Sequence, residues 1–303
     1  MWISFIVIVL VMLAIDLKIF HRQAHQVQLR EAVIWSIVWV AVSLAFAAGV
    51  YVELGQEPAT KFLTGYLVEK ALSMDNLFVF LVIFSYFGVP SAYQHTVLFW
   101  GILGALVFRA LFIAAGVTLI QTLSWSVYVL GGFLVYTGIQ LAMSKDKEFH
   151  PEKNVGIRIF KRFFPVTSEY HGGAFFVRLN GVLTATPLFI TLIVVETTDV
   201  VFATDSIPAI LGITTDTFLV YSSNIFAILG LRAMYFVLAG IMGLFRFLHY
   251  GLSLILIFVG VKMFAGDFLH MSVLLELGIV VGILAASVLI SLLIPAPRDE
   301  TPA

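Results

Sequence analysis

The sequence predicts an all-α, polytopic membrane protein with about nine transmembrane helices. Of its 303 residues, 61% are hydrophobic and 12% are charged, whereas soluble domains contain about 25% charged residues. The mean hydropathy is +1.05, and apolar runs of about 20 residues, the length that crosses a bilayer, recur along the chain. Because the chain has no cysteine, disulfides, zinc–cysteine sites and thiol catalysis are excluded.

Nine apolar runs are predicted to span the membrane. The first has no basic segment before it and carries Asp16 and Lys18 at its far end. We therefore expect it to be kept as a span rather than removed as a signal peptide. The predicted spans are 2-20, 33-52, 62-87, 96-117, 123-143, 183-211, 217-240, 248-266 and 272-294.

The distribution of lysine and arginine predicts the orientation, because these residues gather in cytoplasmic loops. If the N-terminus is outside, the outer loops hold only Lys61. The predicted cytoplasmic segments then hold Lys18, Arg22, Arg30, Lys145, Lys147, Lys153, Arg158, Lys161, Arg162, Arg178, Arg246 and Arg298. Within spans lie Lys70, Arg109, Arg232 and Lys262, of which the two lysines lie near enough to the outer boundary to reach water. We predict the N-terminus out and the C-terminus in.

The predicted loop 144-181 contains seven basic and four acidic residues. Within it, Ile157-Arg-Ile-Phe-Lys-Arg-Phe-Phe164 alternates apolar and basic residues at helical spacing. This pattern favours a helix lying on the anionic inner leaflet. The segment either only anchors the topology or also forms a regulatory or partner site.

Three pairs of segments indicate an internal repeat. The motif starting at Glu69 matches the one starting at Asp199, Arg109 matches Arg232 within similar residues, and Val135-Tyr-Thr-Gly138-Ile-Gln-Leu matches Ile257-Phe-Val-Gly260-Val-Lys-Met. Since each copy has three spans, the second enters from the opposite face, which predicts an inverted repeat of three plus three helices. The chain then divides into peripheral helices (1-52), a first repeat (53-143), a basic cytoplasmic linker (144-181), a second repeat (182-267) and a final helix with its tail (268-303).

The repeated motif places carboxylates inside spans 3 and 6. Each copy has an acidic residue followed six positions later by an aspartate with a small polar neighbour. A charge at the centre of a membrane helix costs roughly 2.5 to 3.5 kcal/mol on the insertion scale, so a repeated cluster indicates a cation site. The predicted metal-binding residues are Glu69, Asp75, Asn76, Glu196, Asp199, Asp205 and Ser206. The predicted supporting residues are Ser73, Thr204, Asn224, Arg109, Arg232 and Asp16.

Helical geometry brings part of this set together. Glu69, Ser73 and Asn76 share one face of span 3, whereas Asp75 needs local unwinding or a second helix. In span 6, Pro208 removes an amide hydrogen, and a helix broken at 203-208 would offer backbone and side-chain oxygens together.

The ligand types favour a hard divalent cation. The motifs offer carboxylate, amide, hydroxyl and carbonyl oxygens and contain no histidine, so manganese, magnesium and calcium are favoured over zinc and copper. Met74 would favour manganese if its thioether joined the site, and otherwise only packs.

Some of these residues have alternative interpretations. The carboxylates could pair with Lys70, Arg109 and Arg232 as a structural network. The two arginines could also hold the carboxylates or replace the ion in an empty state. Asp16 is either an interface charge or part of a proton or ion entrance, and Asn224 either bonds a neighbouring helix or binds the ion.

Three motifs resemble the signatures of the TerC family of integral membrane proteins. They are Glu69-Lys-Ala-Leu-Ser-Met-Asp-Asn-Leu-Phe-Val-Phe80, Glu196-Thr-Thr-Asp-Val-Val-Phe-Ala-Thr-Asp-Ser-Ile-Pro-Ala209 and Ser223-Asn-Ile-Phe-Ala-Ile-Leu-Gly-Leu-Arg-Ala-Met-Tyr-Phe236. Ala14-Ile-Asp-Leu17 and the nine-span layout resemble the Alx-like branch. The resemblance implies a manganese exporter of the bacterial inner membrane, related to cation-efflux and LysE-like transporters and linked to tellurite resistance and alkaline-induced expression.

The sequence therefore predicts a transporter that exports Mn2+ as its substrate, with proton coupling as a hypothesis. An enzyme is disfavoured because the motifs of presenilin-like, zinc and rhomboid proteases are absent. Neither an organic cofactor nor a nucleic-acid partner is expected, and the oligomeric state is left open. The alternative is a non-transporting membrane scaffold that delivers metal or assembles a tellurite- or stress-resistance complex.

Overall fold

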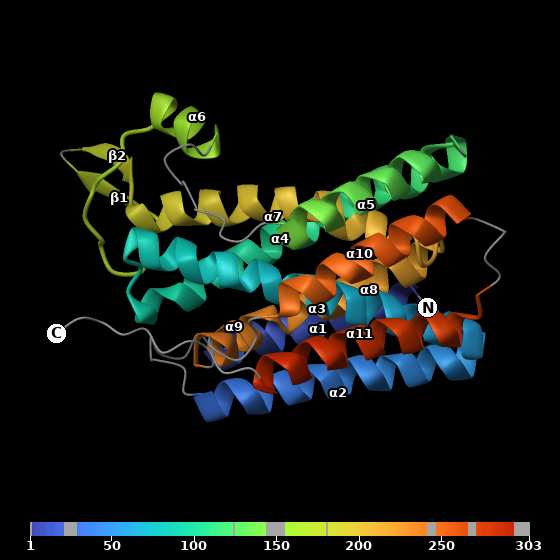
Figure 1. The fold of residues 1–303 in the computed structure, drawn as a ribbon. Helices are drawn as coiled ribbons and strands as arrows, with labels where there is room; N and C mark the ends of the chain where they lie inside the picture. The colour runs from blue at the N-terminus through green and yellow to red at the C-terminus, as the bar shows by residue number, and fades with distance from the viewer. Residues whose placement is uncertain are drawn as a thin grey trace.

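The computed structural model describes residues 2–20, 29–123, 125–143, 155–179, 181–240, 247–265 and 271–293. These residues form eleven helices and one short β-hairpin (Figure 1). The helices are α1 (Trp2–Phe20), α2 (Leu29–Leu54), α3 (Gln56–Phe87), α4 (Ser91–Thr122), α5 (Ser126–Met143), α6 (Val155–Phe163), α7 (Pro187–Leu211), α8 (Thr217–Leu229), α9 (Leu231–Gly240), α10 (Leu248–Ala265) and α11 (Val273–Leu293).

The predicted class, a polytopic helical membrane protein, is confirmed. Among the described residues, six helices are long and apolar enough to cross a membrane, namely α2, α4, α5, α7, α10 and α11. The pair α8 and α9, bent by 41° at their junction, would form a seventh span. Helices α1 and α3 also coincide with predicted spans, but their crossing of a membrane stays a prediction.

The linker contains the one departure from an all-α fold in the described part of the chain. Strands β1 (Phe176–Leu179) and β2 (Val182–Ala185) pair antiparallel, with Leu179 opposite Val182. The Asn-Gly pair at 180-181 is the strongest short hairpin signal a sequence can contain, and Gly181 has a φ of 83°, which a glycine adopts without strain. Consequently the span predicted to begin at 183 begins at Pro187, directly after the hairpin.

The predicted linker helix is present as α6, which packs against α7. Phe160 of α6 stacks on Phe164 and contacts Phe189, near the start of α7. Figure 1 shows α6 and the hairpin together at the end of the bundle opposite the N-terminus.

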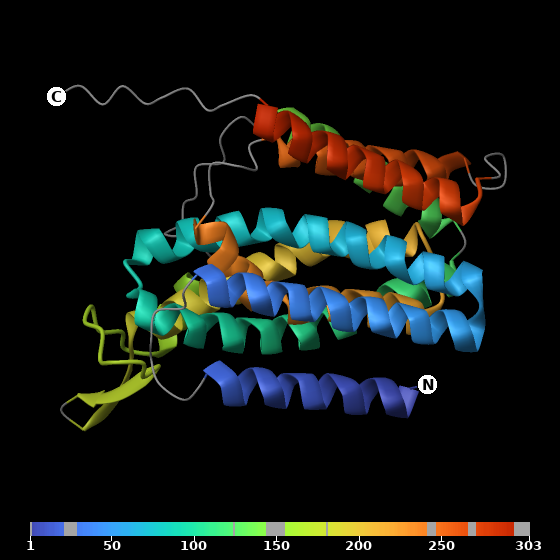
Figure 2. The same cartoon turned by 90° about the horizontal axis from the view of Figure 1, so that it is seen from below.

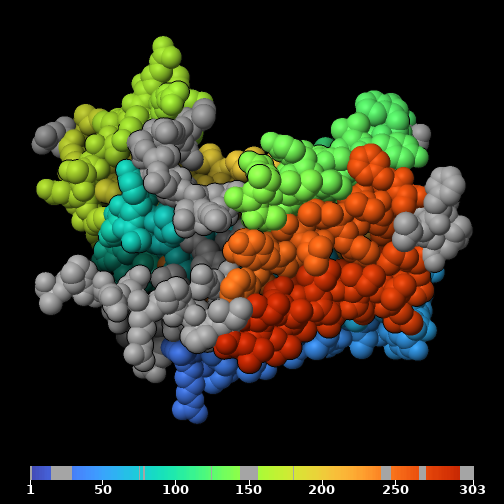
Figure 3. All heavy atoms as spheres, viewed as in Figure 1, coloured from blue at the N-terminus to red at the C-terminus, as the bar shows by residue number. Residues whose placement is uncertain are grey.

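Helices α5, α10 and α11 form a layer beside the main bundle (Figure 2). Helices α5 and α10 approach each other closely at two glycines. A Cβ on Gly131 would lie only 3.0 Å from the Gly260 carbonyl oxygen. Further along, the Ser253 hydroxyl donates to the Gly138 carbonyl at 2.6 Å. In the space-filling view, these three helices form a continuous surface (Figure 3).

Candidate functional site

A buried arginine lies at the centre of the candidate site. Arg109, on α4, is 1% exposed and donates from Nη1 to Oε1 of Glu69 on α3. Its Nε and Nη2 donate to Oδ2 and Oδ1 of Asp199 on α7, at 3.4 and 3.3 Å. The same Nη1 donates to the hydroxyl of Ser206 at 3.3 Å, about two helical turns beyond Asp199 on α7. One guanidinium on α4 thus joins two carboxylates, one from α3 and one from α7.

The two carboxylates of this cluster are almost completely buried. Glu69 is 0% exposed and Asp199 is 5% exposed. The Ser73 hydroxyl donates to Oε1 of Glu69 at 3.3 Å, whereas Oε2 of Glu69 has no hydrogen-bond partner among the described residues. Removing one member of such a buried pair strands the opposite charge, which typically costs about 3 to 5 kcal/mol. The arginine therefore stabilises the carboxylates in this conformation.

Glu196 lies three residues before Asp199 on α7 and packs against the backbone of Gly104 on α4. A Cβ at Gly104 would overlap both carboxylate oxygens of Glu196. Oε2 of Glu196 is buried and lacks a hydrogen-bond partner within the described structure. Gly104 therefore provides the space that the Glu196 carboxyl group occupies.

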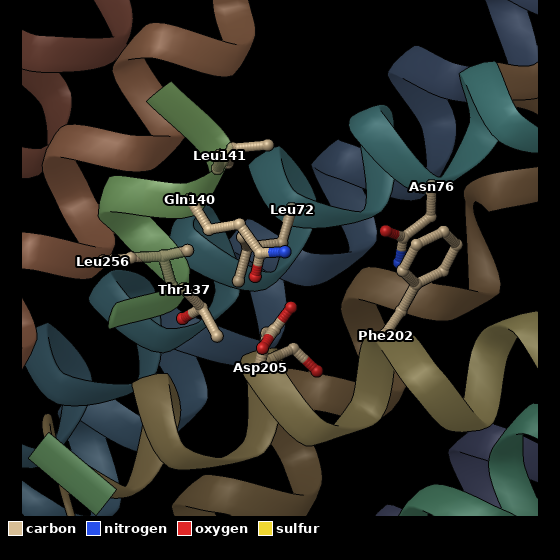
Figure 4. Close-up of a pocket in the computed structure, with 9 residues that line it drawn as sticks. Leu72, Asn76, Thr137, Gln140, Leu141, Phe202, Asp205 and Leu256 are labelled. Carbon is tan, nitrogen blue, oxygen red and sulfur yellow. The ribbon is translucent and has the colours of Figure 1, made fainter. Parts of the chain in front are cut away.

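A small cavity of about 70 Å³ adjoins this cluster. Ser206 belongs to both, because it contacts Arg109 and lines the cavity. Figure 4 shows Gln140 and Thr137 gathered near Asp205, with Asn76 and Phe202 further along the cavity. The lining residues come from α3 (Leu72, Asn76), α5 (Thr137, Gln140, Leu141), α7 (Phe202, Asp205, Ser206) and α10 (Leu256).

The structure thus divides the predicted site into two adjacent groups. Glu69, Ser73, Arg109, Asp199 and Ser206 form the ion-paired cluster. Asn76 and Asp205 line the neighbouring cavity, which Ser206 connects to the cluster.

The remaining predicted residues are Thr204, Arg232, Asn224, Asp16 and Asp75. Thr204 is exposed, and its hydroxyl donates to the Val201 carbonyl in its own helix at 2.6 Å. Arg232 and Asn224 are buried in α9 and α8. Asp16 and Asp75 are helical in backbone, in α1 and α3, but their side chains are not among those described. In the described part of the chain, no three histidine or acidic side chains are arranged to hold a metal ion.

The expected break of span 6 at 203-208 is wrong. Helix α7 continues through Pro208 to Leu211, because loss of one amide hydrogen near a helix end removes a single bond while the rest of the helix is kept by packing. A bend that the sequence did not predict lies in span 7, at Gly230 between α8 and α9. There the Lys70 ammonium donates to the Ala227 carbonyl at 3.0 Å, so Lys70 contacts α8.

Sequence reasoning missed three polar groups. Thr137 and Gln140 line the cavity, and Glu276 of α11 is 2% exposed and receives a 2.6 Å bond from Lys262 of α10. The signal for Glu276 was present, because its position falls inside the ninth predicted span. The polarity of Gln140, near the end of an apolar run, gave no comparable signal.

The fold and this buried charged cluster define a multi-pass integral membrane protein with an ionisable site among its helices. The chain belongs to the TerC family of integral membrane proteins, whose profile matches residues 54–299. It is 50% identical to an uncharacterized membrane protein of Myxococcus xanthus, covering 97% of this chain and 92% of the relative. It is 45% identical to the putative membrane-bound redox modulator Alx of Escherichia coli K12, covering 99% and 96%. A membrane protein of Rickettsia bellii is 38% identical over 96% of this chain and 97% of its own length. No solved structure matches the chain significantly.

Proposed function

We propose that this protein exports a divalent cation, with Mn2+ as the favoured substrate, from the cytoplasm across the bacterial inner membrane. The single observation that carries the proposal is the position of Arg109. Its guanidinium contacts Glu69, Asp199 and Ser206 together, so a cation already occupies the place where three oxygen-bearing side chains meet. A mobile arginine and a metal ion would compete for these oxygens.

The chemistry of the oxygens supports the choice of ion. Carboxylate, hydroxyl and amide groups suit manganese, magnesium or calcium better than zinc or copper. In the proposed cycle, Asn76 and Asp205 of the cavity receive the cation, which then displaces Arg109 from Glu69 and Asp199. Displacement needs only short movements, because Ser206 lies at both places.

The inverted repeat is part of this proposal, and two pairs of contacts support it. With the 122-residue offset of the matching segments, Gly131 corresponds to Ser253 and Gly138 corresponds to Gly260. When each residue is replaced by its equivalent in the other copy, the contact of Gly131 with Gly260 becomes the contact of Ser253 with Gly138, and both contacts are present. A two-fold axis produces such an exchange, and transporters with inverted repeats alternate access around a central site.

The orientation, N-terminus out and C-terminus in, is supported by charge. Arg158, Lys161, Arg162 and Arg178 lie in the segment formed by α6 and β1, at one end of the bundle, and Lys61 lies in the first turns of α3. Basic residues mark the cytoplasmic side. The large basic segment would then face the cytoplasm.

Exchange with protons is the proposed means of completing the cycle. Carboxylates release a metal more readily when protons compete for the same oxygens. No chemical step on a substrate is part of the proposal, so the protein is not proposed to be an enzyme. The relatives named as putative redox modulators suggest another role, but this chain has no cysteine, and thiol exchange is therefore unavailable to it.

The test is manganese flux in proteoliposomes that contain only the purified protein. We expect Mn2+ to move, and cells lacking the protein to accumulate manganese and become sensitive to it. If the purified protein bound Mn2+ without flux, it would be a metal-delivery scaffold. If calcium or magnesium moved instead, the metal assignment would be wrong.

A further inference from the structure

The two ends of the proposed cation path carry different residues at equivalent positions of the repeat. In the alignment of the two matching segments, Thr137 is equivalent to Val259, and Gln140 is equivalent to Lys262. Thr137 and Gln140 line the cavity beside Asp205, and Gln140 is exposed. This end therefore presents neutral oxygen-bearing groups at the surface of the layer formed by α5 and α10.

The equivalent residues on α10 close the other end. Val259 is 0% exposed, and a Cβ at Gly212, at the end of α7, would lie 2.5 Å from Val259 Cγ1 and 2.9 Å from Met263 Sδ. With the 130-residue offset, Gly212 corresponds to Val82 of α3, which is 50% exposed. The junction of α7 with α10 is thus closely packed, whereas the residue equivalent to Gly212 lies at the surface.

Lys262 holds this closed junction with its ammonium group. Nζ donates to Oε2 of Glu276 on α11 at 2.6 Å and to the carbonyl of Gly212 at 3.3 Å. The side chain is 22% exposed, whereas that of Glu276 is 3% exposed. One lysine therefore connects the end of α7 with α10 and α11.

We propose that Gln140 and Lys262, at equivalent positions of the two halves, decide which end of the cation path is open in this conformation. The neutral Gln140 end admits a divalent cation to Asp205. The Lys262 end is held shut by the bonds of Lys262 to Glu276 and Gly212. This inference rests on the proposed function, for which it assigns the open and the closed end. Lys262 acts as a positioning residue rather than as a ligand.

The absence of cysteine from the chain allows a direct test with introduced thiols. Thr137→Cys and Val259→Cys form a matched pair at equivalent positions. Each is treated in oriented vesicles with a membrane-impermeant cationic methanethiosulfonate, added from one side at a time. We expect Thr137→Cys to react from the side of α6 and the hairpin, and Val259→Cys to stay unreactive from both sides.

The lysine is then removed in each background. Lys262→Gln should make Val259→Cys reactive from the opposite side while leaving the reactivity of Thr137→Cys unchanged, which also reports that the variant is folded. Because Lys262→Gln leaves Glu276 unpaired, Lys262→Gln/Glu276→Gln is a second variant in which both charges are removed. Equal reactivity of the two thiols in the parent, or an unreactive Val259→Cys in both Lys262 variants, would overturn the proposal.

Flux separates this inference from the proposed function. Lys262→Gln should raise manganese leak through the vesicle membrane in both directions on the order of tenfold, the factor expected for the loss of one hydrogen bond to a charged group. Unequal thiol reactivity that responds to Lys262, in a protein with no manganese flux, would reject only the exporter. Flux through a protein whose two thiols react alike would reject only the closed end at Lys262.

Discussion

Arg109 binds Asp199 through two of its nitrogens, Nε to Oδ2 at 3.4 Å and Nη2 to Oδ1 at 3.3 Å. Its remaining nitrogen contacts Glu69, the residue that the proposed repeat makes equivalent to Asp199. A single cation on α4 thus joins two carboxylates that the proposed repeat places in different halves. In the proposed transport cycle, relative movement of the halves would break this ion pair, and the pair would connect ion binding to conformation.

The first prediction replaces this cation. Arg109→Gln leaves Glu69 and Asp199 buried without their partner, and we expect metal-free protein to lose about 3 to 5 kcal/mol of stability. Added Mn2+ should raise the melting temperature of the variant more than that of the parent, because a metal bound only to the folded state stabilises it. The measurement is thermal unfolding in detergent with and without Mn2+. Arg178→Gln, on the exposed strand β1, is the matched control, and equal metal-induced shifts in all three proteins would argue against exchange of arginine and ion.

The second prediction concerns the contact between α5 and α10. Gly260→Ala would place a Cβ 2.6 Å from the Gly131 carbonyl oxygen, and Gly138→Ala would place one 2.8 Å from Ile257 Cγ1 and 2.9 Å from the Ser253 carbonyl oxygen. Both variants should unfold at lower temperature, because overpacking costs typically about 1 to 3 kcal/mol. The control is Gly49→Ala on α2, where a Cβ meets nothing within 4 Å. An exposed alanine is a better helix former than glycine by about 1 kcal/mol, so this control should be neutral or stabilising.

A related prediction concerns architecture. Helices α3 to α5 should superpose on α7 to α10 about an axis in the membrane plane, with Asp75 on Asp205 and Arg109 on Arg232, in an experimental structure solved within a lipid bilayer. An axis along the membrane normal would contradict the inverted repeat.

The sequence was sufficient for the helices because a membrane span needs a long apolar run, and α4, α10 and α11 all follow such runs. It also identified the members of the ion-paired cluster, since buried charges are rare and conspicuous in a membrane protein. It could not identify which charges pair, because the contact of Arg109 with Asp199 depends on how α4 and α7 pack. The absence of the break expected at 203-208 in span 6, and the unpredicted bend at Gly230 in span 7, have the same reason: neighbouring contacts, such as Lys70 with Ala227, decide where a helix bends.

The third prediction concerns Gly104. Gly104→Ala would force its methyl group onto the Glu196 carboxyl group, so the side chain of Glu196 must move or α4 must separate from α7. We expect reduced flux and a lower melting temperature. Gly104→Ala/Glu196→Ala should recover stability relative to Gly104→Ala alone, because the overlap is removed, and a double-mutant cycle with Glu196→Ala measures this coupling. Additive effects would mean that the two residues do not interact in the folded protein.

The last prediction separates an ion site from a structural network. Asp205→Asn keeps the volume of the side chain that lines the cavity but removes its charge, so manganese flux should collapse while the amount of folded protein in the membrane stays the same. Asp75→Asn, at the equivalent position of the other half, should behave alike.

Asp199→Asn removes a partner of Arg109 and should reduce both flux and stability, since an uncompensated buried arginine is destabilising. Each variant is measured twice, as protein amount in the membrane and as Mn2+ flux per molecule, with Glu53→Gln on the exposed end of α2 as the control. If Asp205→Asn lost folded protein in parallel with flux, Asp205 would belong to a structural network; a stable, inactive variant that no longer binds Mn2+ would place it in the cation path.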